Sequence, residues 1–315
     1  MAGNNHLLIL ASDARAYQQI IDQAALPLLQ TAVSDAVSEA SRELAECDIL
    51  LGSPDLLAPA LPHARRVKWV QSTWAGITPL LAKGMRRDYL LTGVKGVFGP
   101  LMAEYVLCHL LMHELKALQR YADQQAGIWA TTTPGTLRGK RIGIMGLGSI
   151  GREIARMVTL FGMNTVGFSR SRRACPGVDR CYLPTELLDF VRDLDYLVAI
   201  LPDTPETDGL INAEVLAAMR ASAVLINVGR GNVVDEPALA RALNEKRIGG
   251  AVLDVFGEEP LPAAHPFWHT PRTILTFHTA ALSSAELVAP IFIDNYQRYC
   301  TGRPLQHTID FTRGY

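Results

Sequence analysis

Polar side chains that could reduce a carbonyl group follow successive apolar segments in the second half of the chain. Arg230 comes after the apolar segment 224–228, and His278 comes directly after the apolar segment 274–277. Between them, Asp254 lies in the apolar segment 251–255, and Glu258 and Glu259 come just after it. A guanidinium can polarise a carbonyl and bind a carboxylate, while an imidazole beside an acidic group can donate a proton. This order predicts a carbonyl-reducing site, although the spacing also fits unrelated surface residues.

A glycine-rich turn at residues 140–151 could bind the second reactant. The segment reads as a strand, a G-x-G-x-x-G turn and an amphipathic helix, and another strand follows at residues 164–168. Gly146 permits a tight turn, Gly148 lets the backbone approach a pyrophosphate, and Gly151 lets the helix pack on its strand. The amides at the helix start favour an anion. This context predicts a dinucleotide site rather than a turn without ligand, contacted by Gly146, Leu147, Gly148, Ser149, Ile150 and Gly151.

The strand after this helix indicates which dinucleotide binds. NAD sites usually carry an acidic residue about 20 residues past the glycines. No acidic residue occurs between Glu153 and Asp179, and the strand ends instead in Ser169, Arg170, Ser171, Arg172 and Arg173. Guanidinium groups bind phosphate bidentately. The pattern predicts NADPH in preference to NADH, and the alternative is a solvated arginine-rich loop.

Composition sets the class of protein. The chain has 315 residues, of which 49% are hydrophobic and 19% charged, with a formal net charge of −1. This length accommodates two domains, and the charge gives no support for a nucleic-acid partner. The five cysteines form no C-x-x-C pair. We therefore expect reduced thiols in a cytoplasmic protein, with no signal peptide, no membrane span and no metal site.

Two α/β series follow one another along the chain. In the first, we expect strands at residues 7–10, 49–51, 69–71 and 89–92, with a helix at 14–29. A long helix at residues 101–120 and an exposed arm at 121–138 come next. These patterns predict a small α/β domain with a parallel sheet.

The second series predicts a doubly wound parallel sheet, with ligands at the carboxyl ends of its strands. We expect six strands, at residues 141–145, 165–168, 196–201, 224–228, 251–255 and 274–277, and helices at 184–192, 213–220 and 236–244. A final helix at residues 283–300 is expected to return to the first domain. The predicted domains are residues 1–97 plus 283–315, which is discontinuous, and residues 98–282.

The motifs together resemble the D-2-hydroxyacid dehydrogenase family, most of all its glyoxylate/hydroxypyruvate reductase A type. The resemblance covers nearly the whole chain and is carried by residues 146–151, 201–207, 226–231, 253–262 and 265–268, and by His278. It implies a Rossmann cofactor domain inserted in a smaller flavodoxin-like α/β domain that binds substrate. It also implies a homodimer formed through the cofactor domain.

The resemblance assigns roles to individual residues. It implies that Arg230 binds the substrate, that His278 is the acid/base and that Glu259 supports His278. Further implied cofactor contacts are Pro202, Thr207, Val228, Gly229, Asp254 and Ala280. The implied substrate loop is Ser72–Gly76, in which the N–H groups of Ala75 and Gly76 bind a carboxylate. Trp74 lies within this loop and could narrow the pocket toward small acids, and a core or interface role is the alternative.

Three positions depart from the family pattern. Phe277 replaces a usual proline before the histidine, Gly229 replaces a usual alanine, and Asp203 replaces a common leucine. None of these changes removes a reacting group, but Phe277 could alter the fit around His278. Trp268, close to His278 in the sequence, could also narrow the pocket.

The leading hypothesis is an NADPH-dependent reductase of small 2-oxo acids, such as glyoxylate or hydroxypyruvate, that forms D-2-hydroxy acids. A phosphoglycerate-type or other D-2-hydroxyacid dehydrogenase is the alternative within the family. A formate dehydrogenase is disfavoured, since that branch has glutamine at the position of Glu259. In a different class, a cofactor-sensing interaction protein with little turnover stays open.

Overall fold

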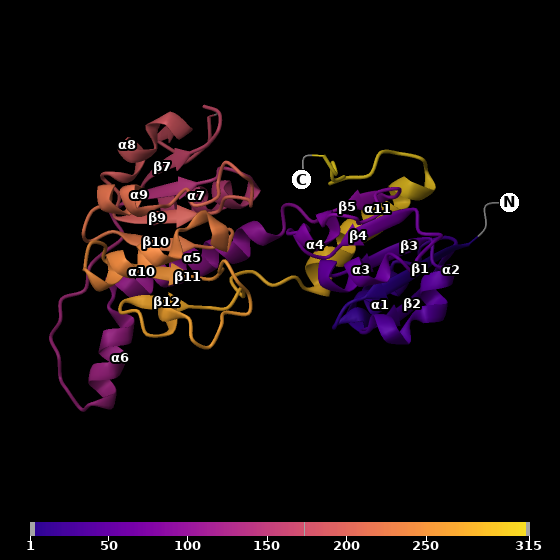
Figure 1. The fold of residues 1–315 in the computed structure, drawn as a ribbon, viewed down its shortest axis with the longest axis horizontal. Helices are drawn as coiled ribbons and strands as arrows, with labels where there is room; N and C mark the ends of the chain where they lie inside the picture. The colour runs from indigo at the N-terminus through magenta and orange to yellow at the C-terminus, as the bar shows by residue number, and fades with distance from the viewer. Residues whose placement is uncertain (1–3, 173, 313–315) are drawn as a thin grey trace. The chain divides into compact units, whose positions relative to one another are not determined.

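The computed structural model describes residues 4–172 and 174–312 and divides the chain into two compact units (Figure 1). The smaller unit consists of Met1–Val97 and Ser283–Tyr315, and the larger unit consists of Phe98–Leu282. Both are α/β structures built on parallel sheets.

The smaller unit contains a five-stranded sheet in the order β2-β1-β3-β4-β5. The strands are β1 (Asn5–Leu10), β2 (Leu29–Ser34), β3 (Ile49–Gly52), β4 (Trp69–Ser72) and β5 (Leu90–Thr92). All four neighbouring pairs are parallel. This is the flavodoxin-like strand order.

Helices cover both faces of the smaller sheet. One face packs on α2 (Ser41–Glu46), α3 (Pro54–Ala60) and α4 (Thr78–Leu81), with the short 3-10 turn η1 (Val37–Glu39) near them. The other face carries α1 (Ala14–Gln23) and α11 (Ala285–Cys300). Trp69 of β4 stacks on Phe292 of α11, with ring centroids 5.1 Å apart. The last helix of the chain thus belongs to the core of the smaller unit.

The larger unit contains a seven-stranded sheet in the order β12-β11-β10-β9-β6-β7-β8, in which all neighbouring pairs are parallel. Its strands are β6 (Arg141–Met145), β7 (Asn164–Phe168), β8 (Arg180–Tyr182), β9 (Tyr196–Ala199), β10 (Val224–Asn227), β11 (Gly250–Leu253) and β12 (Thr273–Leu275). Counted from β6, this is the Rossmann order with one additional edge strand. The strand order reverses between β6 and β9, where dinucleotides bind in such sheets.

The strands of the larger sheet alternate their side chains between two cores. Leu197, Leu225 and Leu253 face a core formed with α8 (Leu187–Val191), α9 (Ala213–Ala218) and α10 (Glu236–Asn244). Val198 and Ile226 face the opposite core, formed with α5 (Phe98–Glu114) and α7 (Ser149–Leu160). The short 3-10 turns are η2 (Pro184–Glu186), η3 (Gly231–Val233) and η4 (Pro266–Trp268). Burial on both faces explains why these strands are nearly continuous apolar runs.

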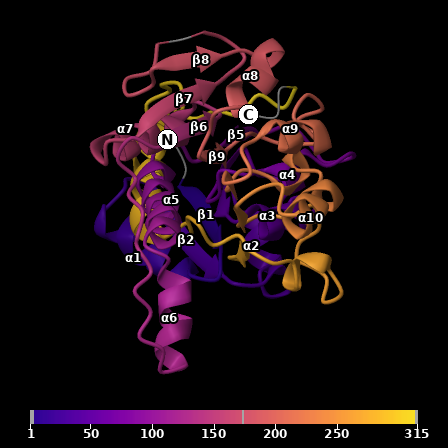
Figure 2. The ribbon, with the colours of Figure 1, turned by 90° about the vertical axis from the view of Figure 1, so that its left-hand side faces the viewer.

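An arm projects from the larger unit at the end of α5. Helix α6 (Ala117–Gln125) extends away from the sheet (Figure 2), and the segment after it carries strongly exposed Trp129. None of the helices in the described residues has the length and apolar character required to cross a membrane.

The structure corrects four predictions about elements. The helix predicted at residues 14–29 ends at Gln23, and strand β2 follows it. The larger sheet has seven strands rather than six because β8 adds an edge. The helix predicted at residues 101–120 divides into α5 and α6, because Lys116 takes a left-handed conformation with φ 53°. The predicted arm at 121–138 consequently begins inside α6.

Candidate functional site

The turn between β6 and α7 has the geometry that a dinucleotide site requires. Gly146 has φ 105°, and a Cβ atom there would lie 2.6 Å from the carbonyl oxygen of Ile200. A Cβ on Gly151 would lie 1.9 Å from the carbonyl oxygen of Gly146, so only glycine allows the helix to start so close to its strand. A Cβ on Gly148 would meet no atom within 4 Å. The backbone is therefore open where a pyrophosphate would approach, and these residues fit a dinucleotide.

Of the remaining residues of the turn, some pack against the sheet and others are exposed. The Leu147 side chain packs against β7, since a Cβ on Gly167 would lie 2.5 Å from its Cδ1. Ser149 is exposed and Ile150 is half-buried in the first turn of α7. Ile154 and Val158 bury the apolar face of the helix, as its periodicity predicts. Leu147 thus contributes its backbone rather than its side chain to the open side of the turn.

The loop after β7 carries the predicted phosphate-binding side chains. Ser169 is half-buried and Ser171 is exposed. Arg170 interacts electrostatically with Glu206. Arg173, the fifth residue of the predicted cluster, lies outside the described residues.

Glu186 gives this loop an acidic neighbour that was not apparent in the sequence. Its Oε1 atom lies 3.1 Å from Nη2 of both Arg172 and Arg180. The backbone N–H of Leu183 donates to its Oε2 atom at 2.8 Å. This hydrogen bond and the two arginines hold the pKa of Glu186 below its ordinary value. A 2′-phosphate bound here would share Arg172 with a fixed negative charge.

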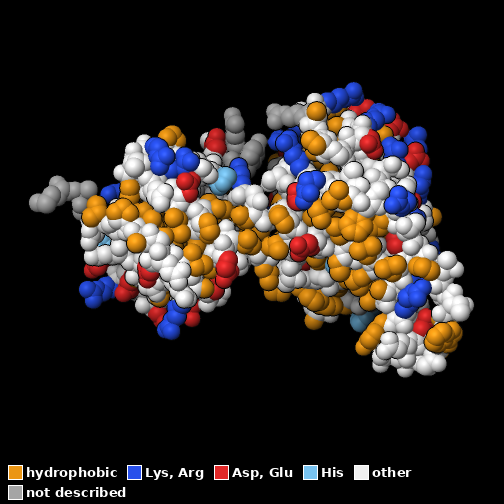
Figure 3. All heavy atoms as spheres, turned by 180° about the vertical axis from the view of Figure 1, so that it is seen from behind, with side chains coloured by type: hydrophobic (Ala, Val, Ile, Leu, Met, Phe, Trp, Pro, Cys, Tyr) orange, Lys and Arg blue, Asp and Glu red, His pale blue; other side chains and the backbone are white. Residues whose placement is uncertain are grey.

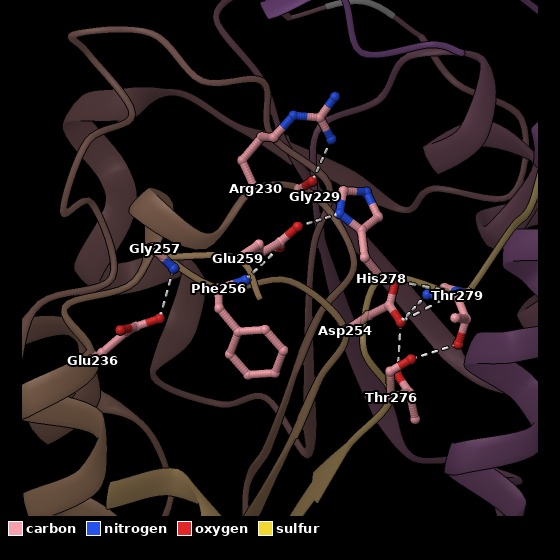
Figure 4. Close-up of polar contacts among 11 residues, drawn as sticks. Gly229, Arg230, Glu236, Asp254, Phe256, Gly257, Glu259, Thr276, His278 and Thr279 are labelled. Carbon is pink, nitrogen blue, oxygen red and sulfur yellow. Dashed lines mark hydrogen bonds and ion pairs between the residues drawn. The ribbon is translucent and has the colours of Figure 1, made fainter. Parts of the chain in front are cut away.

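Arg230 is positioned by the turn that follows β10. Asn227 organises this turn, because its side chain accepts from the Gly229 N–H and donates to the Arg230 carbonyl. The guanidinium donates from Nη1 to the Gly229 carbonyl at 2.6 Å (Figure 4). Burial lowers the pKa of Arg230, and the carboxylates of Glu259 and Asp203 oppose that effect. The side chain still carries its charge, since a guanidinium does not lose its proton in proteins.

His278 and Glu259 meet directly. The Nδ1 atom of His278 lies 2.7 Å from Oε2 of Glu259, and the imidazole remains 54% exposed (Figure 4). The other carboxylate oxygen, Oε1, accepts from the Phe256 N–H at 2.9 Å. Glu259 therefore fixes the ring through Nδ1 and leaves Nε2, on the opposite edge, for a ligand.

Asp254 anchors the backbone around His278. Its carboxylate is 1% exposed and accepts hydrogen bonds from the Thr276 hydroxyl, the Thr279 N–H and the Ala280 N–H. The Tyr105 hydroxyl of α5 contacts the Thr276 hydroxyl in turn. All these hydrogen bonds hold the segment that carries His278. A contact between Asp254 or Ala280 and the cofactor stays a prediction.

The departures at 277 and 229 have a structural basis. Phe277 has φ 55° and His278 has φ 58°. Proline is restricted to φ near −65°, so it could not adopt this conformation at position 277. The Phe277 ring is 56% exposed and lies 5.6 Å from the Trp268 ring. At Gly229, a Cβ atom would lie only 2.8 Å from the backbone nitrogen of Leu201.

The remaining predicted residues lie at three places. Pro202 and Thr207 belong to the loop after β9, where the Thr207 hydroxyl donates to the Pro202 carbonyl at 2.6 Å. Val228 is buried at the end of β10. In the smaller unit, the predicted substrate loop Ser72–Gly76 begins at the last residue of β4. Within it, Trp74 is 43% exposed, Ala75 is exposed and Gly76 is half-buried.

Comparison with known proteins identifies the family. Residues 107–280 match the model of the "D-isomer specific 2-hydroxyacid dehydrogenase, NAD binding domain". The chain belongs to the D-isomer specific 2-hydroxyacid dehydrogenases. A glyoxylate/hydroxypyruvate reductase A of Escherichia fergusonii is 35% identical over 263 residues, which cover 80% of this chain and 83% of that protein.

Two solved members of the D-isomer specific 2-hydroxyacid dehydrogenases share the fold over nearly the entire chain. One from Aeromonas salmonicida is 40% identical with a TM-score of 0.96, covering 98% of this chain and all of that one. One from Xanthobacter autotrophicus, solved in complex with NADPH and MES, is 30% identical with a TM-score of 0.88, covering 100% of both chains. The chain is accordingly an NAD(P)-dependent oxidoreductase with a Rossmann-type α/β fold.

In this dehydrogenase, several residues around the site were missed by sequence reasoning. They are Tyr105, Glu186, Glu236 and Thr276, and His265 belongs to a segment that carried the resemblance but was assigned no role. Thr276 lies two residues before His278, and its place near a strand end was the available signal. Glu186 and Tyr105 come from distant segments, so no local pattern connects them with the site.

Proposed function

We propose that the protein reduces small 2-oxo acids, such as glyoxylate and hydroxypyruvate, to D-2-hydroxy acids with NADPH. The observation that supports this most directly is the His278–Glu259 pair, with Nδ1 and Oε2 2.7 Å apart. The Arg230 guanidinium interacts electrostatically with the same carboxylate. The names of the relatives agree with a reductase of this substrate class.

Each residue has a distinct role in this reaction. Bound NADPH supplies the hydride. Arg230 polarises the carbonyl oxygen and binds the neighbouring carboxylate of the substrate. His278 donates the proton from Nε2 to the developing alkoxide, while Glu259 stabilises the protonated ring through Nδ1. The N–H groups of Ala75 and Gly76 are proposed as further donors to the substrate carboxylate.

The preference for NADPH rests on the loop after β7. Arg170 and Arg172 provide guanidinium groups for a 2′-phosphate, with the hydroxyls of Ser169 and Ser171 beside them. The Xanthobacter relative was solved with NADPH, which agrees with this preference. The Glu186 carboxylate orients Arg172 in advance but also competes with phosphate for it.

A panel of 2-oxo acids assayed with both reduced nucleotides tests the proposal. We expect oxidation of NADPH with glyoxylate and hydroxypyruvate, and lower kcat/KM with NADH. A clear preference for NADH would refute the cofactor assignment. Tight nucleotide binding with negligible turnover across the panel would favour the cofactor-sensing interaction protein instead.

Replacement of His278 by Asn tests the assignment of the proton donor. We expect kcat to fall about 100-fold to 10,000-fold, because proton transfer contributes that much. The nucleotide Kd should stay nearly constant. Replacement of the exposed His63 by Asn is the matched control, and equal kinetics for both variants would contradict the role of His278.

We also propose a homodimer formed through the larger unit. The arm carries exposed apolar side chains at Leu115, Leu118, Tyr121, Ile128 and Trp129, the last 94% exposed. Figure 3 shows hydrophobic side chains at this projecting arm. Such a group on a projecting element is typical of a protein interface. Light scattering should give twice the chain mass for the wild type and less for a variant with Tyr121 and Trp129 replaced by Ser.

A further inference from the structure

Glu236, at the start of α10, lies outside the reacting groups but binds the loop that carries Glu259. Its Oε1 atom accepts from the Gly257 N–H at 2.9 Å (Figure 4). Its Oε2 atom lies 3.3 Å from Nε2 of His265. Gly257 and His265 are on either side of Glu259 in the sequence. One carboxylate thus fastens both ends of the loop.

The tautomer of His265 makes this second contact a hydrogen bond that needs no net charge. The Phe267 N–H donates to Nδ1 of His265 at 3.3 Å. A neutral ring that accepts at Nδ1 carries its proton at Nε2, the atom that faces Glu236. The His265 and Glu236 side chains are 20% and 19% exposed, so water competes little for these contacts.

The two successive peptides that flank Phe256 are held by different carboxylates. The Phe256 N–H binds Glu259, and the neighbouring Gly257 N–H binds Glu236. On the packed side, a Cβ on Gly231 would lie 1.8 Å from the Phe256 carbonyl carbon. Gly231 follows Arg230 directly. The positions of these two peptides therefore set where Glu259 lies relative to both His278 and Arg230.

We propose that Glu236 is a positioning residue that holds Glu259 against His278. It acts through its contacts with the Gly257 N–H and with His265. The inference rests on the proposed function, since it assigns Glu236 to the same proton transfer. Glu259 binds the imidazole, and Arg230 interacts electrostatically with that carboxylate and with Asp203.

Replacement of Glu236 by Ala tests the proposal through the pH profile. The variant should lose about tenfold to 100-fold in kcat/KM, as misplacement of a reacting group does. A displaced Glu259 stabilises the protonated ring less. The pH at which the reduction rate falls by half on the alkaline side should therefore move lower. A purely structural role would lower Tm without moving that midpoint.

Matched variants separate positioning from general damage. Glu245→Ala changes the residue that caps the C-terminus of the same helix and breaks an exposed ion pair with Arg247, and it should leave the pH profile unchanged. Glu236→Gln keeps an acceptor for one of the two contacts and should give an intermediate shift, which also serves if the alanine variant does not fold. Adding Glu236→Ala to the Glu259→Gln variant should lower kcat/KM by less than about a further twofold, because both substitutions act through the Glu259 carboxylate. Additive losses, or an unmoved midpoint, would overturn the proposal.

A readout without turnover distinguishes this inference from the proposed reaction. NMR titration of the His278 ring, assigned with His278→Asn, should show a lower midpoint in Glu236→Ala than in the wild type and Glu245→Ala. If the wild type reduces no 2-oxo acid but the midpoint still moves, the proposed function fails and the positioning role stands. If the wild type is active and the midpoint stays, only the positioning role is wrong.

Discussion

The first turns of the two sheets have the same length and the same hydrogen bond to the end of the next strand, yet only one turn is suited to a nucleotide. In the smaller unit, Ala11 follows β1 and its N–H donates to the carbonyl of Ser34 at the end of β2. In the larger unit, Gly146 follows β6 and its N–H donates to the carbonyl of Phe168 at the end of β7. The helix that follows begins after Asp13 in one case and after Gly148 in the other.

The two turns differ both in backbone conformation and in the side chains that they carry. Gly146 has φ 105°, and φ and ψ are −107° and 26° at Asp13 but −72° and −165° at Gly148. Asp13 places an exposed carboxylate at the helix start, whereas Gly148 leaves that position open. The next strand is followed by Asp35 in the smaller unit and by Ser169 and Arg170 in the larger one. A helix N-terminus is thus available in both sheets, but glycines and basic residues convert only one into an anion site.

Gly151→Ala should disrupt the second turn most severely. The added Cβ would lie 1.9 Å from the Gly146 carbonyl oxygen, so the helix must shift. We expect the free energy of unfolding to fall by about 1–3 kcal/mol. Nucleotide affinity, measured by fluorescence titration, should fall at least about tenfold. The control Gly148→Ala adds a Cβ into open space and should keep its Tm. Wild-type affinity in Gly151→Ala would show that close packing here is irrelevant to binding.

Gly148→Asp makes the start of α7 resemble the start of α1. Aspartate is a favourable residue at this position, so stability should not fall. Its charge should weaken NADPH binding about tenfold or more at low salt, and added salt should reduce the difference. The neutral Gly148→Asn variant has the same size and isolates the charge. If Gly148→Asp and Gly148→Asn bind NADPH equally, charge repulsion does not explain why only the second turn is suited to a nucleotide.

Arg172→Ala tests whether the basic residues after β7 make this end of the larger sheet a phosphate site. We expect the NADPH preference, as the ratio of kcat/KM values, to fall about tenfold because a bidentate phosphate contact is lost. The kcat/KM value measured with NADH should change little. Arg180→Ala removes the other ion pair of Glu186 and is the control for the loss of an arginine partner from this carboxylate. Equal losses with both nucleotides would indicate a structural role for Arg172.

Asp13→Asn should have the smallest effect. This exposed side chain makes no hydrogen bond that caps its helix. Nucleotide Kd and kcat/KM should therefore stay within about twofold of the wild type. A larger change in nucleotide binding would mean that the first turn participates after all.

The sequence predicted the interior of the fold better than its edges. The strands buried on both faces, such as Tyr196–Ala199, were placed within two residues because their side chains form continuous apolar runs. The missed strands β2 and β8 lie at sheet edges, and β2 is only half-buried along most of its length. The break between α5 and α6 at Lys116 involves neither glycine nor proline, so the local residue types did not indicate it.

Prediction of the site had a similar limit. Arg230, Glu259 and His278 follow strands whose ends meet at one sheet edge, so topology alone brings them close. The Glu236–His265 contact joins residues that lie on a helix and a loop, and it depends on side-chain directions that spacing does not encode. Glu186 likewise reaches Arg172 only once β8 has paired with β7.

The buried Asp254 carboxylate gives the segment after His278 an unusual protection from solvent. The Thr279 and Ala280 amides lie outside any strand, yet both donate to an acceptor that water scarcely reaches. Their deuterium exchange should be as slow as that of amides in the sheet. Mass spectrometry of a peptide spanning these residues would therefore record the opening of this segment on a scale of minutes to hours.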